Sequence, residues 1–252
     1  MPGLVETRRE GRVLVVSMQR EAKRNAVNRA LALEIDAALN TLDDDPDLWA
    51  GVLTGTATFF SAGSDVSPEG GDYHTERGGA YGIIERRRRK PLVAAVEGFA
   101  LGGGFEIALA CDMVVASTTA RFGLPEVTIG VIPTCAGLFR GPRALPLNIA
   151  RELILTGVPM GAERAHALGF VNVLTEPGGA VAGALELAQR ITANAPLSVQ
   201  ACLAAVNELV GADDEAGWQA TRDALALIVD SDDRHEGVRA FLEKRPPRWT
   251  GR

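Results

Sequence analysis

Three short segments of the sequence carry residues that could perform acid–base chemistry next to a polarised carbonyl group. Ser61–Asp65 is a turn of small residues, Gly102–Glu106 is a glycine turn that enters a helix, and Leu124–Glu126 places a carboxylate in a third loop. Glycine lets the backbone approach a ligand closely, and the first N–H groups of a helix have no partner inside the helix. These N–H groups and the helix dipole favour negative charge. The two turns could therefore supply the backbone donors of an oxyanion hole.

The same segments contain two glutamates that could transfer protons. Glu106 lies three residues after Gly103, so it projects from the same side of the first helical turn. A carboxylate beside an oxyanion hole suits proton abstraction or activation of water. If Glu126 faces Glu106, the two carboxylates cannot both ionise easily, which gives an acid and a base together. Taken singly, each feature is also typical of a structural role, because a glutamate in a first helical turn or on a surface is commonplace.

The rest of the chain must form the elements that bring these segments together. Short β-branched or apolar runs predict strands, and apolar residues at helical spacing predict helices. The expected strands are Val13–Met18, Gly51–Thr54, Leu92–Val96, Met113–Ala116, a short strand within Arg121–Gly130, and Val171–Leu174. The expected helices are Ala30–Leu42, Tyr81–Lys90, Phe105–Ala110, Ile149–Leu155, Ala162–Leu168, Ala182–Ala193, Leu197–Val210, Glu215–Val229 and Asp232–Glu243, and Phe59–Val66 is expected to be a loop. Strands and helices alternate to about residue 140 and helices dominate afterwards, which predicts an α/β fold with a helical C-terminal region.

The composition and charge of the chain argue against several classes of partner and site. The chain has 252 residues, 26 basic and 32 acidic side chains and a net charge of −6, which argues against nucleic acid or an anionic membrane as a general partner. Its three cysteines are widely spaced and form no CxxC pair, so neither a zinc cluster nor a disulfide framework is predicted. No secretory signal or membrane-spanning run is evident, and a cytoplasmic location is expected.

Two further motifs need an interpretation. Gly102–Gly104 does not continue into a dinucleotide-binding fingerprint, because the position that needs glycine is Ile107. The basic run Arg86–Lys90 is interpreted as a solvated face at the end of a helix, where cations favour the dipole. Contact with RNA, phosphate or the anionic tail of a small molecule remains the alternative.

Taken together, the motifs resemble those of the enoyl-CoA hydratase (crotonase) family over nearly the whole chain. They occur in the family's order: Arg24–Asn28, Phe60–Asp65, Ala94–Glu106, Phe122–Val127, Leu155–Gly157 and Ala240–Arg245. The resemblance implies a crotonase-like spiral of repeated ββα units over residues 1–195, continuous with a helical trimerisation region over residues 196–252. It also implies homotrimers, often paired into hexamers, and an acyl-CoA thioester substrate. No cofactor beyond the coenzyme A of the substrate, and no metal, is implied.

By position, the resemblance also implies roles for individual residues. Glu106 and Glu126 match the two catalytic glutamates, and the backbone N–H groups of Ser64 and Gly103 match the oxyanion hole. Contacts to the CoA thioester are implied for Arg24, Ala26, Ala62, Ser64, Asp65, Val66, Gly102, Gly103, Phe241 and Lys244. The last two match residues that often reach CoA from a neighbouring subunit.

The implied activity is reversible hydration of a 2-enoyl-CoA, as in fatty acid β-oxidation. An enoyl-CoA isomerase or a carnitinyl-CoA dehydratase-like lyase is the nearest alternative, and a non-catalytic CoA-thioester or RNA-binding protein is the alternative of another class. The sequence departs from the usual hydratase pattern at Thr134–Leu138, a segment near the acyl pocket in the family. Within that segment Cys135 is interpreted as a small buried filler, with a reactive thiol as the alternative.

Overall fold

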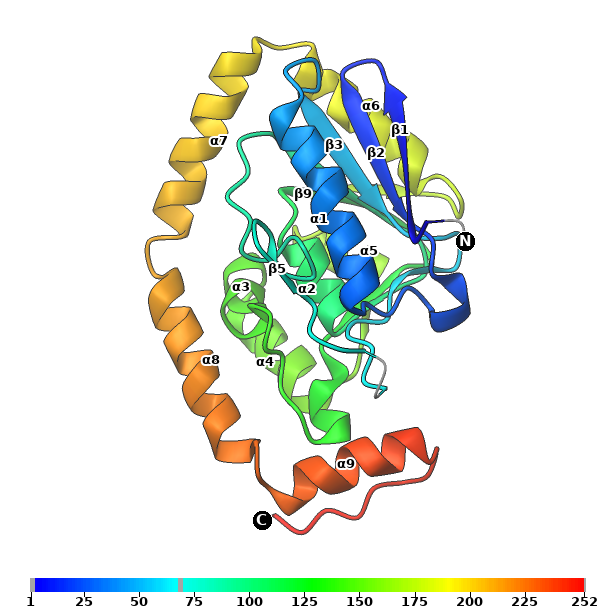
Figure 1. The fold of residues 1–252 in the computed structure, drawn as a ribbon, viewed down its shortest axis with the longest axis vertical. Coiled ribbons are helices and arrows are strands. Elements are labelled where there is room, and N and C mark those ends of the chain that lie inside the picture. Colours follow the sequence, from blue (N-terminus) through cyan, green and yellow to red (C-terminus); the bar gives the residue numbers. More distant parts are fainter. Residues whose placement is uncertain (1–2, 68–69, 252) are drawn as a thin grey trace.

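Strands from the first 175 residues form two main sheets, which Figure 1 shows with the helices around them. The structure is a computed structural model that describes residues 3–67 and 70–251. The larger sheet has the order β1 (Val5–Glu10), β2 (Val13–Met18), β3 (Ala50–Thr54), β7 (Leu92–Val96), β9 (Met113–Ser117) and β12 (Val173–Thr175). The smaller sheet has the order β11 (Met160–Gly161), β10 (Arg121–Gly123), β8 (Phe99–Leu101) and β4 (Phe59–Ser61), and β5 (His74–Thr75) pairs with β6 (Gly79–Ala80).

The two sheets are built by one repeated path of the chain. The pairs β3–β4, β7–β8 and β9–β10 each give one strand to the larger sheet and the next strand to the smaller sheet. Within each sheet these strands lie side by side and parallel, so every turn of the chain advances both sheets by one strand. This path confirms the predicted spiral of repeated ββα units, in which β7 and β8 are followed by the helix Gly103–Leu109. It also brings the loops that follow β4, β8 and β10 to neighbouring positions.

The larger sheet is covered on both faces, which explains why its central strands read as continuous apolar runs. In β7 every residue is buried, and Val93 and Ala95 face one cluster while Leu92, Ala94 and Val96 face the other. The first cluster includes Ala180, Ala184 and Ala188 of α6 (Ala180–Thr192), whose small side chains let the helix approach the sheet. The second includes Leu31, Ile35, Leu39 and Leu42 of α1 (Arg29–Asp44).

The remaining helices follow strands of the two sheets or form the C-terminal region. They are α2 (Gly103–Leu109), α3 (Gly137–Ala144), α4 (Leu147–Thr156), α5 (Ala162–Ala167), α7 (Pro196–Val210), α8 (Asp214–Ile228), α9 (Asp232–Leu242) and the 3₁₀ turns η1 (Glu21–Lys23) and η2 (Pro125–Ile129). In Figure 1, α7 and α8 run along one side of the molecule and α9 crosses below it. None of the helices in residues 3–67 and 70–251 is long and apolar enough to cross a membrane.

Most predicted elements are confirmed to within two residues at either end. The prediction that Phe59–Val66 is entirely a loop is wrong at its start, because Phe59–Ser61 forms β4. The sequence analysis also missed β1, β8 and α3. Helix α3 has only eight residues, and they include Pro142 and two glycines, which are poor helix formers.

The predicted helix Tyr81–Lys90 is wrong, because this segment consists of turns. Tyr81 has φ of +57° and Gly82 has φ of +77°, which a right-handed helix cannot accommodate. Gly82 lies directly against helix α1, where a Cβ would come within 2.5 Å of the carbonyl oxygen of Ala32. Tertiary packing against α1 therefore overrides the local helical preference of the segment.

The interpretation of Arg86–Lys90 as a solvated face is also wrong. The side chain of Arg86 is 2% exposed and forms ion pairs with Asp36 (2.5 Å) and Asp43 (2.9 Å) of α1. Arg88 pairs with Asp112 at 2.6 Å, and the Lys90 ammonium donates to the carbonyl oxygen of Leu42. Three of the five basic residues therefore fasten this segment to the core and are not free to bind an anion.

Candidate active site

The small-residue turn after β4 is fixed by hydrogen bonds to the segment before α1. The Val27 N–H donates to the carbonyl oxygen of Gly63 at 2.7 Å, and the Asp65 N–H donates to the carbonyl oxygen of Val27 at 2.9 Å. The Ser61 hydroxyl donates to the carbonyl oxygen of Asn25 and accepts from the Gly63 N–H. These contacts hold the turn in one conformation, with the Ser64 N–H left out of the pairing.

The same turn touches the start of α2. Gly63 has φ of +90°, and a Cβ built on it would lie 2.7 Å from the backbone nitrogen of Gly103. Only glycine permits this approach. The Gly103 N–H is the first of α2 and has no partner inside the helix. Within residues 3–67 and 70–251, neither Ser64 N–H nor Gly103 N–H donates to any protein acceptor. The structure thus brings together two unused backbone donors from loops that are about 40 residues apart in sequence.

Glu106 lies one turn further along α2 and is 1% exposed. Its Oε1 accepts hydrogen bonds from the Cys135 and Gly137 N–H groups, both at 2.8 Å. Burial raises the pKa of Glu106 to about 7, while the two hydrogen bonds and Arg140 act in the opposite direction. The carboxyl group is therefore poised to exchange a proton near neutral pH.

Glu126 reaches the same region from η2. Its Oε1 is close to Gly102, where a Cβ would lie 3.2 Å from it, and its buried Oε2 has no hydrogen-bond partner in the described residues. Burial raises the pKa of Glu126 to about 8, and the charge of Glu106 contributes to the increase. Two carboxyl groups thus lie at the Gly102–Gly103 turn, and between pH 7 and pH 8 they hold about one proton between them.

The backbone donors to Glu106 were not foreseen from the sequence. Cys135 and Gly137 stand at the start of α3, and Ala136 between them has φ of +77°. Cys135 is 2% exposed, and burial raises the pKa of its thiol, which agrees with a buried filler and not a reactive thiolate. The sequence marked this segment only because Thr134–Leu138 departs from the usual hydratase pattern. It did not indicate that the segment donates hydrogen bonds to Glu106.

Most residues implied to contact CoA lie around the first turn. The Ala62 N–H donates to the carbonyl oxygen of Arg24 at 3.0 Å, so the segments that carry Arg24, Ala26, Ala62 and Val66 run side by side. Asp65 forms an ion pair with Arg20 at 2.8 Å. These segments converge on the two free N–H groups.

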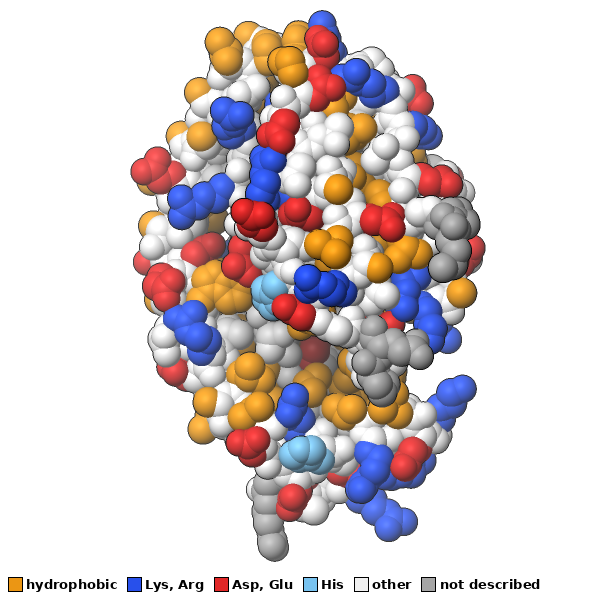
Figure 2. Space-filling model, in the orientation of Figure 1, with side chains coloured by type: hydrophobic (Ala, Val, Ile, Leu, Met, Phe, Trp, Pro, Cys, Tyr) orange, Lys and Arg blue, Asp and Glu red, His pale blue; other side chains and the backbone are white. Residues whose placement is uncertain are grey.

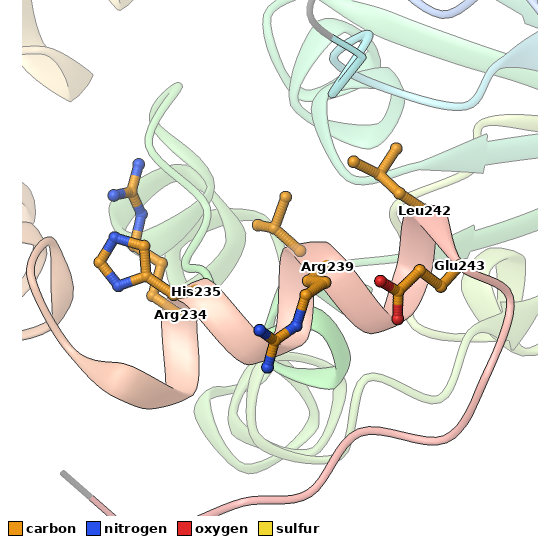
Figure 3. A pocket seen from close by; sticks show the side chains of 6 residues that line it. Arg234, His235, Arg239, Leu242 and Glu243 are labelled. Carbon is orange, nitrogen blue, oxygen red and sulfur yellow. The ribbon is translucent and has the colours of Figure 1, made fainter.

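Phe241 and Lys244 are not brought to this turn by the contacts of the single chain. Phe241 is 53% exposed at the end of α9, and α9 packs against η2. A surface depression on α9 is lined by Arg234, His235, Val238, Arg239, Leu242 and Glu243 (Figure 3). Its lining comes from α9 and the residue that directly follows it, and it contains neither glutamate of the site.

Comparison with known proteins decides the family. The model of the enoyl-CoA hydratase/isomerase family matches residues 8–252. The chain belongs to this family. It is 36% identical to the 2,3-dehydroadipyl-CoA hydratase of Escherichia coli strain K12, with 97% of each chain covered. It is also 36% identical to the short-chain-enoyl-CoA hydratase of Clostridium acetobutylicum, with 94% of each chain covered.

Solved structures of the family share the fold over the full length. The crystal structure of carnitinyl-CoA hydratase from Mycobacterium avium matches with a TM-score of 0.93 and 40% identity, covering 100% of both chains. The enoyl-CoA hydratase from Mycobacterium tuberculosis H37Rv matches with a TM-score of 0.80 and 42% identity, again over 100% of both chains. The predicted crotonase-like fold with a helical C-terminal region is thereby confirmed.

Proposed function

We propose that this member of the enoyl-CoA hydratase/isomerase family is an enoyl-CoA hydratase that adds water reversibly to a 2-enoyl-CoA. The observation that carries the proposal is the pair of buried carboxyl groups, Glu106 and Glu126, beside two unused backbone donors. Such donors stabilise the negative charge that develops on a thioester oxygen. Two carboxyl groups with pKa values near 7 and 8 supply a base and an acid at neutral pH.

The proposed reaction assigns one proton transfer to each glutamate. Ionised Glu106 takes a proton from water while the water oxygen forms a bond to the β carbon. The C=C electrons move toward the thioester, and the enolate oxygen is held by the Ser64 and Gly103 N–H groups. Glu126 orients the water and delivers its proton to the α carbon, which gives 3-hydroxyacyl-CoA. Glu106 then releases to solvent the proton it gained, and Glu126 takes one up, which restores both groups and balances the reaction without any further cofactor.

The environments of the two carboxyl groups support this division of roles. Glu106 accepts two backbone hydrogen bonds, which favour its charged form. Glu126 has the higher pKa and a buried oxygen, Oε2, without a protein partner, which leaves it free to hold water or substrate. Glu106 therefore suits the base, and Glu126 suits the acid.

The test follows loss of the conjugated enoyl-thioester absorbance with the wild-type protein and the Glu106→Gln and Glu126→Gln variants. The relatives are named for dehydroadipyl, short-chain and carnitinyl acyl groups, so the panel should include short straight-chain and carboxylate-ended 2-enoyl-CoAs and the 2-enoyl-CoA that forms when carnitinyl-CoA loses water. We expect turnover by the wild type and a loss of at least about 10²-fold in kcat for each variant. The exposed Glu163→Gln is the matched control, and its kcat should stay at the wild-type value.

Product analysis separates hydration from the alternatives. Formation of 3-hydroxyacyl-CoA supports the proposal, whereas a shifted double bond without uptake of water would identify an isomerase. Tight binding of the panel without any conversion would point to a CoA-thioester binder instead.

We further propose that the chain works as a homotrimer or a hexamer in the cytoplasm. Helices α7 and α8 bury almost none of their side chains within the chain, although both contain large apolar residues. Leu197 is 77% exposed, Leu209 is 79% exposed and Leu227 is 84% exposed. Figure 2 shows hydrophobic side chains among charged ones along the edge that α7 and α8 occupy. Contacts between copies would cover these side chains and could bring Phe241 and Lys244 to the CoA of a neighbouring subunit. The three free cysteines suit a reducing compartment.

A further inference from the structure

A buried tyrosine hydroxyl contacts both residues of the proposed oxyanion hole. The Tyr81 hydroxyl lies 2.6 Å from the Ser64 hydroxyl, within strong hydrogen-bond distance. A Cβ built on Gly103 would lie only 2.4 Å from the same oxygen and 2.6 Å from the carbon that bears it. Tyr81 is 1% exposed, so the phenol group fills the space beside both donors.

The tyrosine is held in this place at a conformational cost. Its φ of +57° lies in the left-handed region, which a bulky side chain rarely adopts because the backbone is strained there. The Tyr81 N–H donates to the carbonyl oxygen of Tyr73, and the two rings pack with centroids 4.7 Å apart. Gly82 and Arg86 fasten the following turn to α1 through close packing and the ion pairs with Asp36 and Asp43. This anchoring keeps the hydroxyl at the two turns.

We propose that Tyr81 is a positioning residue for thioester polarisation, and that its hydroxyl aims the Ser64 and Gly103 N–H groups at the substrate oxygen. The Ser64 hydrogen bond restrains the first turn, and contact with Gly103 restrains the start of α2. Backbone donors stabilise an enolate only when they point to where its charge develops. A small reorientation of either turn therefore weakens catalysis without removing a donor. The inference rests on the proposed function, because it assumes a thioester in this site.

Burial keeps the phenol protonated at neutral pH. The pKa of Tyr81 is raised well above its usual range, first by burial and then by the neighbouring Cys135 and Glu106. The group therefore acts as a neutral hydrogen-bond partner of Ser64, and not as a base in the reaction.

The test replaces each half of the hydrogen bond. Tyr81→Phe keeps the ring, and Ser64→Ala keeps the backbone donor. In each variant we expect about a tenfold drop in kcat with KM nearly unchanged, less than the roughly 10²–10³-fold loss that follows removal of a donor. The double variant should lose no more than the larger single loss, because both changes break the same contact. Ser117→Ala removes a buried hydroxyl paired with Thr119 away from these turns, and it should leave kcat unchanged.

A spectroscopic readout separates polarisation from stability. 4-Dimethylaminocinnamoyl-CoA absorbs at longer wavelength when its thioester carbonyl is polarised, so its red shift on binding reports the aim of the donors. We expect a smaller shift at saturation in Tyr81→Phe and Ser64→Ala than in wild type and Ser117→Ala. If Tyr81→Phe does not fold, Ser64→Ala carries the same expectation from the other side of the contact.

Two results overturn the inference while leaving the hydratase proposal in place. One is a wild-type kcat and red shift in the folded Tyr81→Phe variant. The other is additive losses in the double variant, which would mean that the hydroxyl acts independently of Ser64. A wild-type protein that neither turns over the enoyl-CoA panel nor shifts the probe would overturn the proposed function, and this inference with it.

Discussion

At the scale of single residues, the chemistry of the site depends on how much of each carboxyl group is taken out of water. Burial is the largest cause of the raised pKa of both Glu106 and Glu126. Without the Cys135 and Gly137 N–H groups, Glu106 would be harder still to ionise. The pair therefore divides into a carboxylate with donors and a carboxylic acid without them.

The pH dependence of the reaction follows from this pair. As the pH falls through about 7, Glu106 gains a proton and the base is lost, and as the pH rises through about 8, Glu126 loses its proton and the acid is lost. We expect kcat/KM to be bell-shaped with its maximum between these values. Measurement from pH 5.5 to 9.5 checks this, and a flat profile between pH 6 and 9 would contradict it.

Glu126→Gln should lose activity but gain stability at alkaline pH. The folded pKa of Glu126, about 8, lies above its ordinary value of 4.5, so the folding free energy it contributes is present below pH 4.5 and is lost as the pH rises through 8. A neutral glutamine avoids that loss. We expect the variant to gain about 1 kcal/mol or more, about 2–4 °C in Tm, at pH 9 and little at pH 5.

Thermal unfolding of the variant at both pH values measures this gain. Glu163→Gln, which replaces an exposed glutamate, is the control and should change Tm little at either pH. A Tm at pH 9 that is lower for Glu126→Gln than for wild type would show that ionised Glu126 is stabilised in the fold.

At the scale of elements, the site depends on loops that are fixed to the core by polar contacts. The segment after β6 is a series of turns with local backbone hydrogen bonds, and the Arg86 side chain ties it to α1. Its guanidinium donates to Asn40, to Asp36 and to Asp43, all on α1. Removing one partner of a buried ion pair strongly destabilises the fold, because the other charge is then left buried and unpaired.

Arg86→Met should therefore be strongly destabilising, because it leaves two carboxylates of α1 beside an apolar side chain. We expect a loss of about 3–5 kcal/mol in the free energy of unfolding, measured by urea denaturation. Arg87→Met, in the adjacent exposed position, should change it by less than about 0.5 kcal/mol. Equal effects of the two substitutions would mean that the ion pairs with α1 contribute little.

At the scale of the whole molecule, the C-terminal helices are incomplete as parts of a single chain. Helix α7 has no buried residue, although leucine, valine and alanine make up much of its sequence. Contiguous exposed apolar surface of this kind marks an interaction site. In the proposed trimer, another copy of the chain would cover this surface.

The oligomer gives a direct prediction. Size-exclusion chromatography with light scattering should give a mass of three or six times the 26.6 kDa chain. The combined Leu197→Glu, Leu209→Glu and Leu227→Glu variant should shift toward monomer, because charges would then lie in the subunit contact. Glu163→Lys on α5 is the charge-changing control and should keep the wild-type mass. A wild-type monomer would contradict the proposal.

The sequence by itself determined the chemical motifs and most regular elements. Apolar runs such as Leu92–Val96 and the amphipathic pattern of α1 report local burial, which the order of residue types records directly. Likewise, the glycines at Gly102–Gly104 and the carboxylates Glu106 and Glu126 mark a site through their types and spacing.

Only the tertiary structure decided which groups surround that site. The donors to Glu106 come from residues 29 and 31 positions later in the chain, and Tyr81 reaches Ser64 across 17 positions. The basic run at Arg86 looked like a solvated face until α1 supplied its carboxylates from 43 and 50 positions away. Such contacts depend on how the spiral brings distant segments together, and no local pattern of residues encodes that proximity.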